Sequence, residues 1–357
     1  MAVIIPDSSV FAGTFPYTGG LRKGRVTMRR TVGAGLLLLL LLFLPPWLRA
    51  EETNTGGSAD APPQTEQSVP DGSSDAAHTV RLWNGSAVET MTAAEYLPGV
   101  VRGEMPAAFE EEALKAQAVA ERTYLYYRMA SAPKENHPDA DVCTDSNCCT
   151  AWLSEADART KWGDKFDRYE ARVQQAVADT DGQVVLYEGA PIMAVFHSSS
   201  AGATAASGDV WTASLPYLVS VKSPEDADSV PNYYSVNTFT AGEFRTIFCK
   251  AHPEAKLSGD TAGWIGDVTL TDAGRGASAR VGGVSVTGKE LRSLYGLRSA
   301  AFTVEAAGDS VTFRVTGYGH GVGMSQYGAN SLAKEGKTWR EILQWYYTGV
   351  TIGLYNG

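Results

Sequence analysis

A single acidic residue, Glu104, lies in the stretch LPGVVRGEMPAAF (residues 97–109), which is otherwise apolar and interrupted by glycine and proline. A carboxyl group kept away from water can exchange protons near neutral pH, because desolvation raises its pKa. The same residue could instead be an ordinary acid near the N-terminus of a helix that begins just downstream, where the helix dipole favours a carboxylate. The residues alone leave both interpretations open.

Four side chains of metal-ligand type fall within thirteen residues: His137, Cys143, Cys148 and Cys149. This donor set is typical of a closed structural zinc site. The spacing differs from a paired C-x-x-C knuckle, and two adjacent cysteines can reach one tetrahedral ion only if the backbone bends. A disulfide, with Cys249 as a possible partner, is the competing interpretation for an exported chain. We favour zinc, in a structural role that leaves no open coordination position.

Two further segments are dense in polar groups. FHSSSAG (residues 196–202) places His197 beside three serines, but no G-x-S-x-G turn is present, and neighbours along a strand point to opposite faces. We therefore disfavour a Ser/His nucleophile. GYGHGVGMSQYGA (residues 317–329) carries five glycines, which indicates either backbone passing close to a ligand or a tight irregular loop. Its polar residues are His320, Ser325, Gln326 and Tyr327.

The elements that must position these groups are a mixture of helices and hairpins. Residues 109–129 carry apolar side chains along one face and three glutamates near the start, which predicts a helix. Asn84 and Gly85, between two apolar runs, predict a hairpin turn. Strands and helices do not alternate regularly, so we expect the α+β fold class. The other expected elements are helices at 161–178, 288–295 and 329–335, a helix opened by a capping box of Thr338 and Glu341, and strands within 182–202, 267–286 and 301–316.

The first 79 residues differ in composition from the rest. Five Lys and Arg residues between positions 22 and 30 precede the uncharged segment 32–48. This pattern predicts a cytoplasmic tail (residues 1–31, or a true start at Met28) and a transmembrane anchor, with a removed signal peptide as the alternative. Residues 49–79 are rich in Gly, Ser, Pro and acids, which indicates a disordered stalk before an extracytoplasmic domain at 80–357.

Charge separates the N-terminal region from the exported domain. Residues 1–50 contain six basic residues and Asp7, a net charge of +5. The whole chain has a net charge of −10, so the other 307 residues carry −15. Nucleic-acid binding rewards clustered basic surface. An acidic exported domain therefore argues against a nucleic-acid partner.

Three long motifs follow one another along the chain. They are LPGVVRGEMP with ALKAQAVAERTY, FHSSSAG with DVW and PYL, and GHGVGMSQYGA with WREILQWYYTG. Together they resemble the stage II sporulation protein D family of lytic transglycosylases, from Val80 to Ile352. The resemblance implies a membrane-tethered enzyme of the mother cell in endospore formers. Such an enzyme cleaves the β-1,4 bond between N-acetylmuramic acid and N-acetylglucosamine in septal peptidoglycan during engulfment.

The resemblance implies that Glu104 is the general acid/base. A hydrolase needs a second carboxylate, but in a lytic transglycosylase the substrate's own C6 hydroxyl attacks and gives a 1,6-anhydro product. A helix N-terminus would lower the pKa of Glu104, so burial has to raise it by more. Arg122 and Tyr124 either line the glycan groove or tie their helix to the core. The full set of candidate glycan-binding residues is Gln117, Arg122, Tyr124, His197, Ser198, Ser200, His320, Ser325, Gln326 and Tyr327.

The resemblance also implies a metal and partners. It includes a zinc ion in the Cys/His loop of some members, with no cofactor needed for catalysis. The implied substrate is a glycan strand whose stem peptides have been removed, and the implied partners are a membrane-bound amidase and a multi-pass scaffold protein. A non-catalytic glycan-binding or amidase-activating module is the alternative, since relatives include proteins that stimulate amidases. A zinc peptidase is disfavoured because no H-E-x-x-H motif is present.

Overall fold

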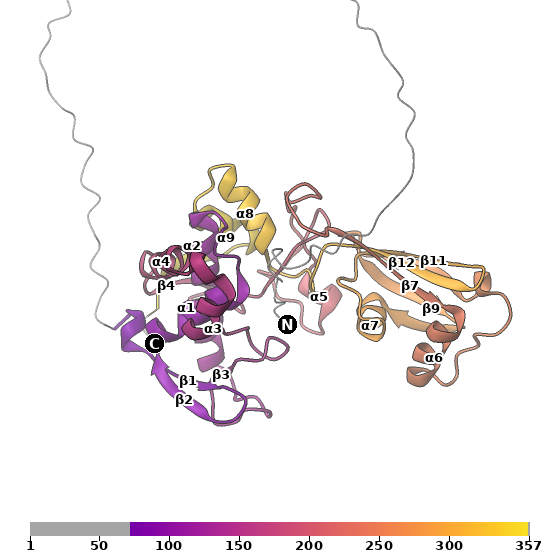
Figure 1. Ribbon diagram of the computed structural model, residues 1–357, viewed down its shortest axis with the longest axis horizontal. Helices are drawn as coiled ribbons and strands as arrows, with labels where there is room; N and C mark the ends of the chain where they lie inside the picture. Colours follow the sequence, from indigo (N-terminus) through magenta and orange to yellow (C-terminus); the bar gives the residue numbers. More distant parts are fainter. Residues whose placement is uncertain (1–71, 356–357) are drawn as a thin grey trace, which may run out of the picture. The chain divides into compact units, whose positions relative to one another are not determined.

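The described chain begins with a short helical turn and a hairpin. The computed structural model describes residues 72–355, and Figure 1 labels their elements. Strands β1 (Thr79–Trp83) and β2 (Val88–Thr92) pair antiparallel. Between them Gly85 has a φ of +98°, a left-handed conformation that glycine adopts without steric cost. The hairpin predicted at Asn84 and Gly85 is confirmed.

Two helices follow the hairpin, and the first was not expected. Helix α1 (Ala93–Glu104) begins at Thr92, whose hydroxyl and the Glu95 carboxylate form a capping box. Sequence rules count Pro98 as a helix breaker, but the cap and the burial of the helix's apolar side chains outweigh that cost. Helix α2 (Glu111–Met129) confirms the helix predicted for residues 109–129.

The first hydrophobic core surrounds helix α2. This helix packs against α1, α4, α8, α9 and strand β4 (Figure 1). Its fully buried alanines, among them Ala116, Ala118 and Ala120, leave room for close helix packing. The elements of this core include α3 (Glu155–Trp162), η3 (Gly163–Lys165), α4 (Phe166–Ala178), β4 (Gln183–Tyr187), β5 (Ala190–Pro191), α8 (Gln326–Lys334), α9 (Trp339–Tyr346) and β14 (Thr351–Leu354).

A second hydrophobic core lies between two antiparallel sheets and two helices. The strand orders are β11-β12-β7 and β10-β9-β8. Stacked aromatic rings fill this core, with Phe244 and Tyr295 centred 4.7 Å apart. The elements are β7 (Tyr234–Thr240), α6 (Ala241–Ala251), η4 (Thr261–Gly263), β8 (Ile265–Leu270), β9 (Gly276–Val281), β10 (Val284–Thr287), α7 (Gly288–Leu294), β11 (Phe302–Ala307) and β12 (Ser310–Thr316). The strands expected within 267–286 and 301–316 are confirmed, as is the α+β class.

Short elements bring distant motifs together. Strand β6 (Phe196–His197) runs parallel to β13 (Met324–Ser325), which joins the serine-rich segment to the glycine-rich loop. Strand β3 (Val142–Cys143) runs parallel to β1 and anchors the Cys/His loop. Helix α5 (Ser207–Val210) is a single turn.

Some boundaries differ from the sequence predictions. The helix expected at 161–178 is two helices, α3 and α4, because Gly163 has a φ of +52° and ends the first. Helix α8 begins at Gln326, three residues earlier than expected, because the Ser325 hydroxyl caps it by accepting from the Gly328 N–H. The capping box of Thr338 and Glu341 is confirmed at the start of α9.

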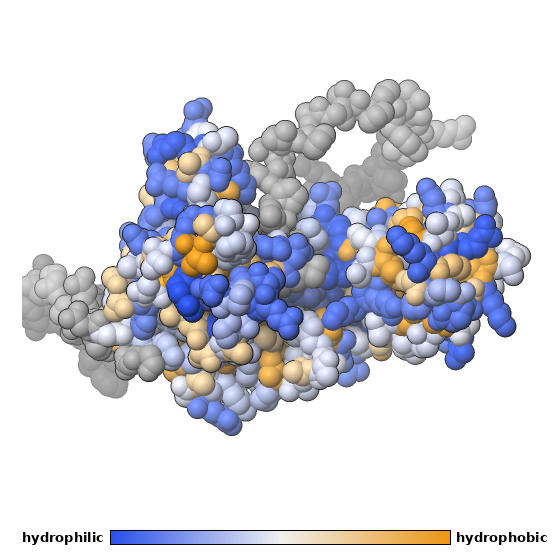
Figure 2. All heavy atoms as spheres, turned by 90° about the horizontal axis from the view of Figure 1, so that it is seen from below, coloured by the Kyte–Doolittle hydropathy of each residue, from blue (hydrophilic) through white to orange (hydrophobic). Residues whose placement is uncertain are grey.

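The predicted stalk, residues 49–79, includes residues that belong to the folded domain. Residues 75–77 form a helical turn, η2, and the Asp75 side chain is buried against helix α2. The predicted tail, the anchor at 32–48 and stalk residues 49–71 lie outside the described residues. No helix between residues 72 and 355 is long and apolar enough to span a bilayer. The face in Figure 2 is mostly hydrophilic, with hydrophobic residues in separate small areas.

Candidate active site and metal centre

Glu104 is the last residue of helix α1, and its side chain is 1% exposed. Its Oε1 accepts the Ala151 N–H at 2.5 Å, while Oε2 has no hydrogen-bond partner among residues 72–355. Burial raises the pKa of Glu104 to about 8, although the Ala151 hydrogen bond opposes this. The carboxyl group is therefore largely protonated at neutral pH and has a free oxygen.

The expected conflict with a helix dipole does not arise. Glu104 ends α1, and the next helix begins only at Glu111. The C-terminus of a helix carries partial negative charge, which disfavours a carboxylate. The dipole of α1 therefore acts in the same direction as burial, and the assumption that a helix N-terminus lies at Glu104 was wrong.

Glu104 lines a pocket of about 400 Å³, which we call the Glu104 pocket. This volume is within the range of small-molecule sites. Aromatic rings that could stack on sugar faces line it together with basic side chains. The lining residues are Arg102, Gly103, Glu104, Met105, Pro106, Ala107, Ala108, Phe109, Glu110, Lys161, Trp162, Tyr169, Ser229, Pro231, Tyr327, Asn330 and Lys334.

Most of these residues were missed at the sequence level. Trp162 and Tyr169 come from helices α3 and α4 and contact each other edge to face, with ring centres 5.6 Å apart. Arg102 forms a buried ion pair with Glu170. No local pattern distinguishes these side chains from ordinary helix residues, because the pocket exists only where residues from 102–110, 161–169, 229–231 and 327–334 meet.

A second buried carboxyl group, Glu121, lies close enough to Glu104 to interact with it electrostatically. Burial and then the charge of Glu104 raise the pKa of Glu121 well above its usual value, against a hydrogen bond from Gln117. Burial thus disfavours the ionised form of Glu121, which makes it a poor candidate for the base or nucleophile that a hydrolase requires.

The motif GMSQYG connects Glu104 to the serine-rich segment. Gln326 donates from Nε2 to the backbone carbonyl of Glu104 at 3.0 Å. The Tyr327 N–H donates to the Ser198 carbonyl at 3.0 Å, and the Tyr327 ring meets Phe109 edge to face in the Glu104 pocket. Residues far apart in sequence therefore hold the end of α1 in place.

A buried carboxylate that the sequence analysis did not single out, Glu225, holds these loops together. Its Oε1 accepts the Ser200 N–H at 2.6 Å and the Ser325 hydroxyl at 2.5 Å, and its Oε2 accepts the Ser223 hydroxyl at 2.5 Å. Glu225 is 3% exposed. Ser325 therefore has a structural contact in the interior, and it does not line the Glu104 pocket.

His197 and Ser200 form a hydrogen bond that was not expected. The Ser200 hydroxyl donates to His197 Nε2 at 2.7 Å, because Nδ1 lies 3.2 Å from the Val322 carbonyl and must carry the proton. Burial lowers the pKa of His197 to about 3. Both side chains are fully buried and line none of the pockets described here. The pair therefore lacks the access that a nucleophile requires.

The remaining predicted groove residues lie in several places. His320 and Tyr124 line a small cavity with Thr150, the residue before the Ala151 that contacts Glu104. Gln117 is buried beside Glu121. Ser198 is buried and contributes its backbone carbonyl.

Arg122 ties its helix to the core, the second of the two roles proposed for it. It is fully buried and forms a two-pronged ion pair with Asp75, with nitrogen to oxygen distances of 2.6 and 2.7 Å. It also donates to the carbonyls of Val177 and Gln183. Arg122 ties helix α2 to η2 and β4 and does not line the Glu104 pocket.

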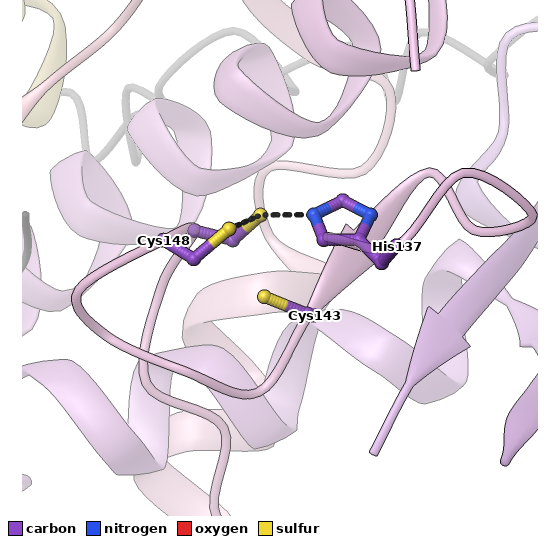
Figure 3. A group of neighbouring side chains, drawn as sticks. His137, Cys143 and Cys148 are labelled. Atoms are coloured by element: carbon purple, nitrogen blue, oxygen red, sulfur yellow. Dashed lines mark hydrogen bonds between the residues drawn. The ribbon is translucent and has the colours of Figure 1, made fainter. Parts of the chain in front are cut away.

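The Cys/His loop brings its four candidate ligands together (Figure 3). One donor atom from each of His137, Cys143, Cys148 and Cys149 lies within 4.8 Å of the others. The Cys148 and Cys149 sulfurs are 3.8 Å apart, and Cys149 Sγ is 3.5 Å from His137 Nε2. Zn–S bonds of about 2.3 Å and a Zn–N bond of about 2.05 Å at tetrahedral angles give separations of about 3.8 and 3.5 Å. The residues therefore fit a zinc ion.

The surroundings of the loop suit a metal better than a disulfide. His137 Nδ1 lies 3.1 Å from the Ala140 carbonyl, which fixes the proton there and leaves Nε2 free to bind a metal. The Cys143 thiol and the Lys134 ammonium stabilise the Cys149 thiolate and lower its pKa to about 4. None of the four described cysteines forms a disulfide, and Cys249 lies on α6 beside the second core.

The loop and the candidate acid are one structural unit. Cys149 is followed by Thr150 and by Ala151, whose N–H is the hydrogen-bond donor to Glu104. Gly103 also packs against Ala151, where a Cβ would come within 2.7 Å of the Ala151 carbonyl oxygen. The conformation of the Cys/His loop therefore controls the environment of Glu104.

A buried glutamate with a raised pKa lines an open pocket next to a Cys/His cluster, and Glu110 is a second, exposed acid in the same lining. Comparison with known proteins defines the class: the chain belongs to the stage II sporulation protein D family, whose members act in sporulation. It is 40% identical over 267 residues to Stage II sporulation protein D of Bacillus subtilis (strain 168), covering 74% of this chain and 76% of that protein. The corresponding protein of Bacillus amyloliquefaciens is 38% identical over 269 residues, covering 74% and 75%.

Two other comparisons bear on the site. The family model described as Stage II sporulation protein matches residues 84–187, which contain Glu104 and the Cys/His loop. The protein called Amidase enhancer in Bacillus subtilis (strain 168) is 29% identical over 308 residues, covering 72% of this chain and 40% of that protein. The resemblance stated from the three motifs is confirmed at the level of the family.

Proposed function

We propose that the chain is a lytic transglycosylase that cleaves the bond between N-acetylmuramic acid and N-acetylglucosamine in peptidoglycan glycan strands. The observation that carries the proposal is Glu104, a buried residue that lines a pocket of about 400 Å³, with a pKa of about 8 and one carboxyl oxygen without a hydrogen-bond partner among residues 72–355. A general acid works best when its pKa is near the operating pH.

One carboxyl group can perform both proton transfers. Protonated Glu104 gives its proton to the glycosidic oxygen as the bond between that oxygen and C1 breaks. The resulting carboxylate then takes the proton of the muramyl C6 hydroxyl as O6 bonds to C1, which returns Glu104 to its starting state and leaves a 1,6-anhydro ring. The environment of Glu121 supports this scheme over hydrolysis, because burial raises its pKa and disfavours the carboxylate that a hydrolase requires.

We propose that the Cys/His loop holds a structural zinc ion through His137, Cys143, Cys148 and Cys149. The ion would bind four protein ligands and take no part in proton transfer. Its effect on the reaction would come through Ala151, whose N–H contacts Glu104. Metal analysis of the purified chain by inductively coupled plasma mass spectrometry tests this, with about one zinc per chain expected.

The setting that we propose is the sporulation septum during engulfment. Residues 22–48 support a single-pass membrane anchor with the catalytic domain outside the cytoplasm, on the mother cell side. The substrate would be peptide-stripped strands, and the partners a membrane-bound amidase and a multi-pass scaffold protein. Loss of septal localisation when residues 32–48 are replaced by a cleavable signal peptide would support the anchor.

The decisive experiment is digestion of purified peptide-free glycan strands by the full chain. Wild-type protein should release fragments with anhydro-muramyl ends, identified by mass spectrometry. General acid–base catalysis contributes about 10²- to 10⁴-fold to a rate, so Glu104→Gln should reduce the rate by about 10³-fold. Glu305→Gln, an exposed position on β11, is the matched control and should leave the rate unchanged.

Other results would change the assignment. Anhydro ends released at the wild-type rate by Glu104→Gln would exclude Glu104 as the catalyst, and reducing ends from the wild type would indicate hydrolysis. The similarity to Amidase enhancer favours a second function, a non-catalytic module that stimulates an amidase. A chain that cleaves no glycan but accelerates a purified wall amidase would establish that function instead.

A further inference from the structure

A buried cation lies in a part of the site that the proposed reaction does not use. The Arg275 side chain, between strands β8 and β9, is 3% exposed. Its Nη2 donates to the carbonyls of Gly319 and His320, at 3.3 and 3.0 Å. Its Nη1 has no hydrogen-bond partner among residues 72–355. A buried guanidinium nitrogen without a partner costs free energy and calls for a ligand.

The glycine-rich loop is built around this guanidinium. Gly321 has a φ of +87°, and a Cβ at this position would lie 2.5 Å from Arg275 Nη1. A side chain at Gly321 would thus displace the guanidinium. The five glycines suggested that the backbone of this loop passes close to another group. In the described chain that group is the Arg275 guanidinium.

Further positive charge surrounds Arg275 in a small cavity. Arg292 and Lys289 line it, with His320, and Arg292 together with burial lowers the pKa of Arg275 to about 10. Among the described residues neither arginine forms an ion pair, and the one acidic residue in the lining is the exposed Asp209. We call this the arginine cavity; its lining residues are Asp209, Val210, Thr271, Arg275, Gly276, Lys289, Arg292, Ala300 and His320.

The size and donors of the arginine cavity select a small anionic group. Its inner volume is about 20 Å³, little more than one water molecule needs, so a sugar ring is excluded and only the end of a ligand, such as one carboxylate oxygen, can enter. Nη2 already donates to two carbonyls, so Arg275 offers an incoming oxygen one charge-assisted hydrogen bond, from Nη1. His320 Nδ1 accepts the Val322 N–H, so a neutral imidazole keeps its proton on Nε2.

We propose that the arginine cavity binds a carboxylate of the glycan strand, the lactyl carboxylate of a muramic acid from which the stem peptide has been removed. This group is an amide while the peptide is attached and a free anion once it is gone. The inference rests on the proposed function for the nature of the ligand. The arginine cavity and the Glu104 pocket share no lining residue, so the carboxylate belongs to a sugar other than the one cleaved.

The test compares two ligands that differ only at the lactyl group, which is a carboxylate in one and a methylamide in the other. Peptide-free oligosaccharides are used with free lactyl carboxylates, and after coupling of the same carboxylates to methylamine. Binding to the full chain carrying Glu104→Gln is measured by isothermal titration calorimetry. We expect the amidated ligand to bind at least tenfold more weakly. Since this comparison needs no change at Arg275, it remains informative if that position tolerates no substitution.

A substitution then locates the effect. Arg275→Lys keeps a donor for the two carbonyls but loses the planar pair of nitrogens. It should reduce the difference between the two ligands to under twofold, while Arg314→Lys, an exposed position on β12, should preserve it. A difference that survives Arg275→Lys, or equal binding of the two ligands from the start, would overturn the proposal.

The outcomes separate this inference from the proposed function. If the chain binds and cleaves both ligands equally, the carboxylate site is rejected and the proposed transglycosylase activity stands. Failure to bind or cleave either ligand would remove both proposals. An Arg275-dependent thermal shift with sodium acetate or inorganic phosphate, without discrimination between the glycans, would assign the cavity to a free anion and so overturn the glycan carboxylate.

Discussion

Glu104 on helix α1 and Arg122 on helix α2 are both deeply buried ionisable side chains, and the two differ in how completely they are hydrogen-bonded. Arg122 is fully buried, and Asp75 and two backbone carbonyls take up its donors. Glu104 is as deeply buried, but it has a single hydrogen bond and an oxygen without a partner in the described chain. A buried group whose bonds are complete stabilises the fold, whereas a buried group with unused bonding capacity is available to a ligand.

The largest expected effect tests the stabilising member of this pair. Asp75→Asn leaves the Arg122 charge buried without its counterion and should lower the free energy of unfolding by about 3–5 kcal/mol. Urea denaturation followed by circular dichroism measures this. Asp267→Asn, which removes a solvent-exposed ion pair with Arg280, is the control and should cost less than about 1 kcal/mol. Equal losses in the two variants would show that the Arg122 pair does not stabilise the fold.

A smaller effect is expected when the Cys/His loop is disturbed. Removal of the proposed zinc with a chelator should loosen the Ala151 N–H that contacts Glu104; because the carboxyl group is protonated, this is a neutral hydrogen bond of about 0.5–1.5 kcal/mol. Activity on peptide-free glycan should fall about two- to tenfold and recover when zinc is added back. Cys249→Ser, in the second core, provides the control and should respond to the chelator as the wild type does. Full activity in metal-free protein would separate the loop from the catalyst.

The pH dependence should reveal the state of Glu104. Its pKa rises from 4.5 to about 8 on folding, so the unfolded chain loses this proton first as pH increases. Stability attributable to Glu104 is therefore full below pH 4.5 and falls by about 1.4 kcal/mol per pH unit until about pH 8. Activity should decline tenfold per unit above pH 8. The stability difference between wild type and Glu104→Gln, measured from pH 4 to 9, should follow this slope, and a flat difference would contradict the raised pKa.

The smallest expected effect concerns Glu121. Burial raises the pKa of Glu121 and disfavours its ionised form, so the carboxyl group can be replaced by an amide that still accepts the Gln117 hydrogen bond. Glu121→Gln should therefore change activity less than about twofold at pH 7 and leave the alkaline limb of the pH profile near 8. A loss approaching that of Glu104→Gln would identify a second catalytic carboxyl group and favour hydrolysis over anhydro-sugar formation.

Local sequence patterns predicted the elements whose signals are local. The hairpin at Asn84 and Gly85, helix α2 and the cap at Thr338 depend on turn geometry, helical periodicity and a hydrogen-bonded box within a few residues. Helix α1 was missed because Pro98 argues against a helix when the sequence is considered locally. The packing of α1 against α2 and α4, which stabilises the helix, is a tertiary effect. The stalk boundary failed for the same reason, since Asp75 is held by Arg122, 47 positions away.

The sequence by itself determined the family, the single candidate acid and the four candidate metal ligands, because these depend on residue identity and short spacing. The tertiary structure decided that Glu104 ends a helix, that Glu121 lies near it, and that Arg122 is a structural counterion. It also decided which aromatic side chains line the Glu104 pocket and that Arg275 lies inside the glycine-rich loop. Burial and electrostatic environment depend on segments that meet only in the folded chain, so no local pattern encodes them.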